Sequence, residues 1–135
     1  MTPAPTLAVI LCAGEPERLY SGLSLLVSVA TDRERCAALA TFRALDLILD
    51  EDLLRRAQEP EATPSLSWAG RETFARSLVE LRDTAFELDS LALYACSASV
   101  ETMALSATDV EGRLDGVMST PRFLSHAEGA RLLFV

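Results

Sequence analysis

Two short, uninterrupted apolar runs constrain the fold of this chain more than any other feature. Thr6–Cys12 reads Thr-Leu-Ala-Val-Ile-Leu-Cys and is closed by Ala13-Gly14, and Leu91–Cys96 reads Leu-Ala-Leu-Tyr-Ala-Cys. A continuous apolar run of this length is typical of a strand that is buried on both faces. Such strands belong to parallel sheets with helices on either side, so the two runs predict an α/β fold.

The rest of the chain alternates the same two kinds of element. Further strands are expected at 36–42, 116–119 and 131–135. Helices are expected at 17–30, 43–49, 71–88 and 120 to about 129, and two further helices are expected to begin near Ser97 and Thr108. Thr41 is the expected N-cap of the helix at 43–49, and Thr108 and Glu111 are expected to form a capping box. This alternation predicts one domain over 1–135, an α/β fold with a five-stranded, mainly parallel sheet and helices on both faces.

The charge and motif content of the chain excludes several functions. Acidic residues outnumber basic ones 20 to 12, which gives a net charge of −8 and argues against nucleic acid or an anionic membrane as a partner. All basic residues are arginine, which removes Schiff-base and P-loop lysine chemistry. The glycines form no nucleotide-binding motif, so no cofactor is expected. No apolar stretch approaches the roughly 20 residues of a membrane helix, and a soluble protein is expected.

The three cysteines, Cys12, Cys36 and Cys96, are expected to be free thiols in a reducing cytoplasm. They form no C-x-x-C pair and no zinc-like spacing with the single histidine, His126, so no metal site is predicted. Cys36 begins a strand and is expected in the core. His126 is expected in solvent and away from Cys96, which argues against a Cys-His hydrolase.

Cys96 is the predicted catalytic residue, because it ends a strand where small residues begin a helix. Ser97, Ala98 and Ser99 allow close approach of a ligand, and the unpaired N–H groups of a helix start favour a thiolate. The alternative is a structural role, since a lone cysteine in an apolar run usually belongs to the core. Glu101 and Thr102, one turn further on, either face the same site or, as is more common for a glutamate on a helix, Glu101 is solvated.

Gly14 and Cys12 complete the predicted site, on the assumption of a strand order 2-1-3-4-5. In that order strands one and three lie side by side, so Cys12 and Cys96 are neighbours and form a resolving pair if their Cα atoms lie within about 7 Å. The alternative is a Cys12 that is simply buried in strand one.

The sequence also gives predictions for three arginines, one tryptophan and one apolar helix. Arg18, Arg43 and Arg122 fall near the carboxyl edge of the sheet, where they either hold an anion or form surface ion pairs. Trp68, in the loop 58–70, is expected to cover a pocket or, more commonly, to anchor the loop. The helix at 17–30 is apolar nearly all round, which predicts a subunit interface that Leu25→Glu would disrupt.

The order of motifs resembles the DsrE/DsrF-like family of small sulfur-handling proteins over nearly the whole chain. The motifs are Gly-x-x-x-Arg-Leu after strand one, a long middle helix, Leu-Tyr-Ala-Cys-Ser-Ala-Ser, and Leu-Asp-Gly-Val-Met-Ser-Thr-Pro-Arg-Phe-Leu with its Gly116-Val117 pair. The resemblance implies a flavodoxin-like fold, a trimeric or hexameric homo-oligomer, and a cysteine at Cys96 that carries persulfide sulfur.

The expected function is that of a cytoplasmic sulfur carrier or sulfurtransferase-like protein, with a sulfur donor and an acceptor protein as partners. The alternative is a non-catalytic, oligomeric module that binds a small ligand or regulates a partner, with Cys96 as part of the pocket wall.

Overall fold

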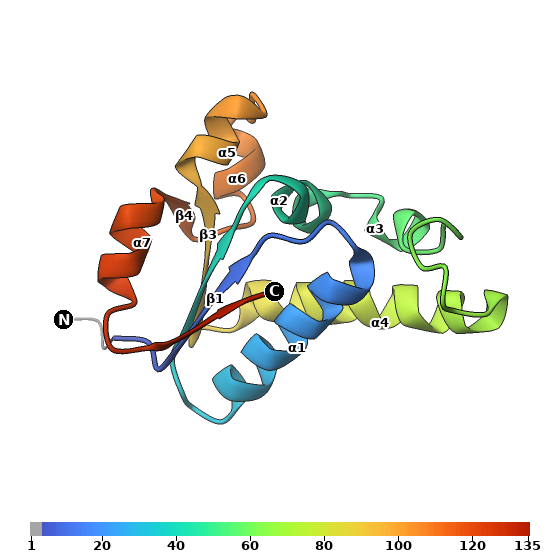
Figure 1. The fold of residues 1–135 in the computed structure, drawn as a ribbon, viewed down its shortest axis with the longest axis horizontal. Coiled ribbons are helices and arrows are strands. Elements are labelled where there is room, and N and C mark those ends of the chain that lie inside the picture. The colour runs from blue at the N-terminus through green and yellow to red at the C-terminus, as the bar shows by residue number, and fades with distance from the viewer. Residues whose placement is uncertain (1–3) are drawn as a thin grey trace.

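The apolar runs form five parallel strands in one sheet, which confirms the predicted fold class (Figure 1). The computed structural model describes residues 4–135. The strands are β1 (Leu7–Leu11), β2 (Cys36–Ala40), β3 (Leu91–Cys96), β4 (Gly116–Met118) and β5 (Arg131–Phe134). The helices are α1 (Pro16–Thr31), α2 (Phe42–Leu49), α3 (Leu53–Arg56), α4 (Trp68–Glu87), α5 (Ser97–Thr102), α6 (Ala107–Glu111) and α7 (Thr120–His126).

The strands lie in the order β4-β3-β2-β1-β5, so the expected order 2-1-3-4-5 is wrong. β2 pairs with both β1 and β3, with Leu11 opposite Ala40 and Ala40 opposite Ala95. The small side chains of β2, Cys-Ala-Ala-Leu-Ala, are buried at every position, as a central strand requires. β1 and β3 are therefore two strand spacings apart rather than adjacent.

Side chains alternate between two cores, one on each face of the sheet. Leu7, Val9 and Leu11 of β1 pack toward α1, α2 and α4, where the larger core lies. Ala8 and Ile10 point to the opposite face, which α7 covers with Phe123 and Ala127. Figure 1 shows α7 on one side of the sheet and α1 with α4 on the other. Helices therefore cover both faces, but one layer is much thinner.

The apolar surplus of α1 is mostly explained within the chain. Tyr20 packs against Phe74 of α4, with ring centroids 5.6 Å apart, and Val27 and Val29 pack against the larger core. Leu25 remains outward and is 43% exposed. The helix is apolar nearly all round because it lies between the sheet and α4, so its composition no longer points to a subunit interface.

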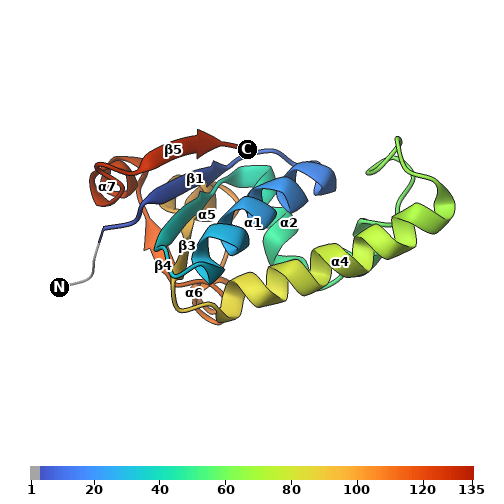
Figure 2. The ribbon, with the colours of Figure 1, turned by 90° about the horizontal axis from the view of Figure 1, so that it is seen from below.

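α4 begins earlier than expected and projects beyond the sandwich (Figure 2). The Ser67 hydroxyl caps it by accepting a hydrogen bond from the Gly70 N–H, so the end of the predicted loop is helical. Trp68 lies in the first turn and is 80% exposed. The prediction that Trp68 covers a pocket or anchors the loop is therefore wrong.

Two predicted caps also differ from those observed. Ser106 and Asp109 form the capping box of α6, in place of Thr108 and Glu111, although both pairs fit the same spacing. Thr41 precedes α2 without a capping hydrogen bond, and its hydroxyl donates to the Leu11 carbonyl at 3.4 Å. No helix within residues 4–135 combines the length and the apolar character needed to cross a bilayer.

Candidate functional site

Cys96 is the last residue of β3 and the residue that precedes α5, as the sequence predicted. Its residue surface is only 4% exposed, and its side chain lies on the thinly covered face of the sheet with Tyr94 and Met118. Because all strands are parallel, this position lies at the carboxyl edge of the sheet, where helix starts collect.

The surroundings of the Cys96 sulfur favour the thiolate. Burial by itself raises the pKa of the Cys96 thiol, but the Ser99 N–H, the Ser99 hydroxyl, the Ala98 N–H and the Thr120 hydroxyl lie where they can donate to a thiolate, and they hold the pKa below its ordinary value. Cys96 is the N-cap residue of α5, and its side chain makes no capping hydrogen bond. The nearby donors favour the charged form, because a thiolate accepts hydrogen bonds more strongly than a thiol.

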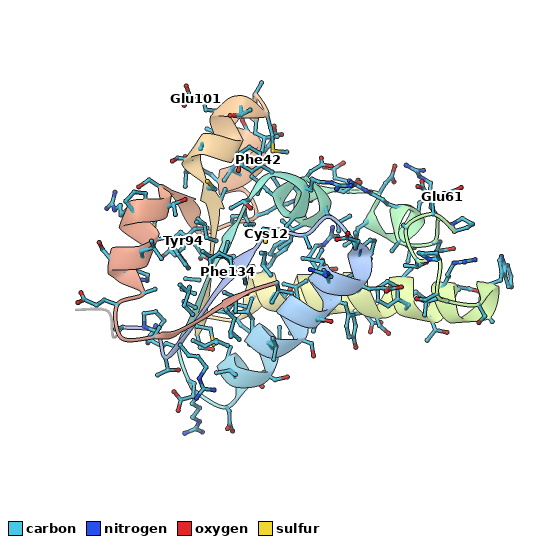
Figure 3. The ribbon with its side chains drawn as sticks, viewed as in Figure 1. Cys12, Phe42, Glu61, Tyr94, Glu101 and Phe134 are labelled. Atoms are coloured by element: carbon cyan, nitrogen blue, oxygen red, sulfur yellow. The ribbon has the colours of Figure 1, made fainter. Side chains whose placement is uncertain are left out.

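Ser99 is the residue that links Cys96 to a second helix. Its side chain is fully buried, and its oxygen accepts a hydrogen bond from the Phe42 N–H at 2.9 Å. The hydroxyl proton is then free to point at the Cys96 sulfur. Phe42 has a φ of 38°, a region that non-glycine residues rarely occupy, and lies where α2 meets α5 (Figure 3).

The starts of three helices therefore meet around one sulfur atom. α5 contributes the Ala98 and Ser99 N–H groups, α7 contributes Thr120, and α2 acts through Ser99. Ser97 begins α5 and is half-buried, but it is not among the groups that lower the pKa. The roles of Phe42 and Thr120 were missed, because contacts between α2, α5 and α7 leave no pattern in the sequence.

Cys12 does not pair with Cys96, and it is not buried in strand one. It follows β1, is exposed, and its thiol lies 3.6 Å from the Val135 carbonyl oxygen. Two strand spacings of about 4.8 Å place β1 and β3 beyond the limit of about 7 Å between the Cα atoms of a disulfide. Both alternatives predicted for Cys12 are therefore wrong.

Gly14 lies against Arg43 rather than against Cys96. A Cβ atom at Gly14 would lie 2.7 Å from Arg43 Nε and 2.9 Å from Arg43 Cβ. The missing side chain lets the arginine cross the loop between β1 and α1. Gly14 thus contributes to the carboxyl edge by making room for a positive charge.

The three arginines of this edge are not engaged in ion pairs. Arg18, Arg43 and Arg122 lie in the first turns of α1, α2 and α7, and none of them forms a salt bridge with another residue of 4–135. The alternative of surface ion pairing is therefore wrong. The arginines keep their charge available at the edge where the Cys96 sulfur lies.

His126 and Glu101 take no part in the site. His126 packs edge-on against Tyr94, with centroids 5.9 Å apart, and lines a small pocket with Ser90 and Ala92 near the amino end of β3. It is half-buried rather than solvated, but it lies away from Cys96, as expected. Glu101 is exposed and points away from the sheet, which confirms that prediction (Figure 3).

The third thiol, Cys36, and an open cleft lie elsewhere. Cys36 is buried, and its burial, followed by the charge of Glu34, raises its pKa. An open cleft of about 700 Å³ lies between α2 and α6 and is lined by Asp46, Asp50, Asp109 and Arg113, among others. Within residues 4–135, no three His, Cys, Asp or Glu side chains cluster as a metal site would require.

Comparison with known proteins adds no family to this description. No protein-family model matches the chain, and no curated protein is significantly similar to it. The resemblance to the DsrE/DsrF-like family therefore stays a prediction from the motifs.

Proposed function

We propose that this chain is a sulfur carrier or sulfurtransferase-like protein that holds a persulfide on Cys96. The observation that carries the proposal is the set of N–H and hydroxyl groups that lower the pKa of the Cys96 thiol despite its burial. A thiolate is the nucleophilic form of cysteine. The same donors suit the terminal sulfur of a persulfide, which is also an anion.

The transfer needs no redox partner. The Cys96 thiolate attacks the outer sulfur of a donor persulfide, so that a new S–S bond forms while the donor's own S–S bond breaks and the donor leaves as a thiolate. The reverse sequence passes the sulfur to the thiolate of an acceptor. Arg43 and Arg122 would attract an anionic donor, because neither charge is neutralised by a carboxylate of the described chain.

The proposal includes a cytoplasmic location, donor and acceptor proteins, and a homo-oligomer of the trimer or hexamer type that the resemblance implies. The unpaired cysteines support the cytoplasmic location.

Intact mass spectrometry after incubation with a sulfane-sulfur donor tests the proposal. The wild-type chain and Cys12→Ser are expected to gain one sulfur atom, which a reducing agent removes, while Cys96→Ser gains none. A sulfur atom that Cys96→Ser still acquires would place the chemistry at another residue.

A second candidate function follows from the burial of Cys96. Because the Cys96 residue is only 4% exposed and the large cleft lies elsewhere, the chain also fits a non-catalytic module that binds a small ligand or regulates a partner. In that case Cys96 only forms part of the wall of the ligand pocket. An alkylation rate no faster than that of a free cysteine at neutral pH would favour the module over the carrier.

A further inference from the structure

The outer edge of β5 is an apolar surface that no element of the described chain covers. Within residues 4–135, β5 pairs with β1 alone, and Figure 2 shows it at the rim of the sheet. Leu132 and Phe134 share a face with Ala8 and Ile10, and they are 39% and 68% exposed. Parallel sheets are normally covered on both faces, so this corner departs from the rule for its class.

The backbone of β5 also has unused hydrogen-bonding groups. The Arg131 N–H donates to the Thr6 carbonyl and the Val135 N–H to the Ile10 carbonyl, both at 2.9 Å. Because backbone groups alternate in direction along a strand, Leu132 and Phe134 direct their N–H and C=O groups to the open edge. An edge of this kind is a template for another strand.

β5 lacks the features that normally prevent such pairing. Edge strands are usually protected by lysine, proline, a bulge or very short length. β4, at the other edge, has three residues, whereas β5 is longer and has a single charge, Arg131, at its start. The β5 edge of the sheet is therefore open to a partner strand, whereas the β4 edge is protected by the short length of its strand.

The distribution of charge indicates which partner fits this edge. Copies of a chain with a net charge of −8 repel one another except where acidic residues are scarce. The last twenty residues, 116–135, contain one acidic residue, Glu128, of the twenty in the chain. α7 and β5 themselves contain no acidic residue, so these two elements bring no carboxylate to a contact between two copies.

We infer that a second copy of this chain pairs with β5 in the antiparallel sense, about a two-fold axis through Leu133. In this register Leu132 lies opposite Phe134 of the second copy, and Phe134 lies opposite its Leu132. Each opposed pair exchanges both backbone hydrogen bonds, because these two residues direct their polar groups outward. All four side chains lie on one face and form an apolar cluster, and the two sheets become one.

The size of the contact sets the expected affinity. A stable interface of standard size takes about 800 Å² from each partner, roughly a tenth of the 7560 Å² surface of this chain. A four-residue strand offers less than that. The dimer is therefore expected to dissociate in the micromolar range. A two-fold contact is also the kind that joins two trimers into a hexamer.

Sedimentation velocity over a range of concentrations tests the interface with Leu132→Pro. Proline removes the outward N–H of Leu132 together with the leucine side chain, and edge strands tolerate it where the N–H does not pair inside the sheet. The wild-type chain is expected to dimerise, Leu132→Pro to raise the dimer Kd at least about tenfold, and Leu25→Glu on α1 to leave it unchanged. A wild-type monomer at about 100 μM, well above the expected Kd, or a dimer lost in Leu25→Glu but not in Leu132→Pro, would overturn the inference.

Disulfide trapping tests the register. Opposed residues that are not hydrogen-bonded have Cα atoms about 4.5 Å apart, within disulfide range, so Leu133→Cys on the two-fold axis is expected to link two copies under mild oxidation. The experiment is made with Cys12 and Cys96 replaced by serine, and Leu124→Cys is the control. Failure of Leu133→Cys to link, or linkage no faster than that of Leu124→Cys, would rule out this pairing.

Discussion

Ser99 is the residue on which the chemistry of Cys96 depends most. Its hydroxyl accepts from the Phe42 N–H, and both its hydroxyl and its N–H act on the Cys96 sulfur. Because the folded-state pKa of Cys96 is lowered, the thiolate stabilises the fold. That contribution is fully present above the unfolded-state pKa of about 8.5 and is lost as pH falls through the folded-state pKa.

Replacing Ser99 with alanine is expected to raise the pKa of Cys96 and slow its alkylation at pH 7 several-fold. The reason is that one donor to the thiolate disappears while burial remains. The pH profile of the iodoacetamide rate is the measurement, with Ser97→Ala as the matched control, because Ser97 does not lower the pKa. A Ser99→Ala profile that coincides with the wild type would show that the hydroxyl has no role.

Arg43 is expected to select anionic reagents at Cys96. In water, a unit charge at a separation of one Debye length, about 8 Å, contributes roughly 0.5 kcal/mol, or about a factor of two in rate. Arg43→Gln should therefore lower the ratio of the iodoacetate rate to the iodoacetamide rate about twofold, and Gly14→Ala should act in the same direction by displacing the guanidinium. Arg76→Gln, which removes a charge on α4 that is paired with Glu72, should leave the ratio unchanged. Equal ratios in all four proteins would argue against an anion-attracting edge.

At the scale of elements, Arg82 ties α4 to the turn after α2. Its side chain is 9% exposed, and Nη1 donates to the Asp50 carbonyl oxygen. Arg82→Met keeps the aliphatic part but leaves that carbonyl without its charged donor, at a cost of about 1.5–3 kcal/mol. Urea unfolding should show this loss, whereas Arg76→Met, at an exposed ion pair, should change the free energy of unfolding by less than about 1 kcal/mol. Equal losses in the two variants would contradict the structural role of Arg82.

The sequence was sufficient to predict the strands and every helix except the short α3, but not which elements are neighbours. All five strands and the start of α5 at Ser97 follow from apolar runs and helix signals, because these depend on burial and local backbone chemistry. The strand order depends on how helices of similar apolar character pack, so nothing local distinguishes β2 from β3 as the neighbour of β1. This is why Cys96 was placed correctly and Cys12 was not.

The same limit applies to the contacts within the site. Ser99 was predicted as a small residue of a helix start, but its bond to the Phe42 N–H joins residues 57 positions apart. The capping box of α6 shows the same limit at short range. Two overlapping residue pairs have the spacing of a capping box, but only Ser106 and Asp109 form its two hydrogen bonds.

At the scale of the whole molecule, the amino-terminal end of α4, which begins at Trp68, projects beyond the sandwich (Figure 1). Trp68 is the only tryptophan and is 80% exposed, so fluorescence of the free chain should resemble that of a hydrated indole and be quenched readily by acrylamide. The dimer formed through β5 should keep this emission, because α4 lies away from that edge. A blue shift on self-association would place Trp68 in the contact between copies instead.

The central claim is that the groups around Cys96 outweigh its burial and make it the reactive thiol. Access favours Cys12, which is exposed, whereas thiolate stabilisation favours Cys96, and Cys36 is buried with a raised pKa. Limiting iodoacetamide at neutral pH, followed by peptide mass spectrometry, compares all three directly. The account predicts that Cys96 is labelled first; preferential labelling of Cys12 or Cys36 would contradict it.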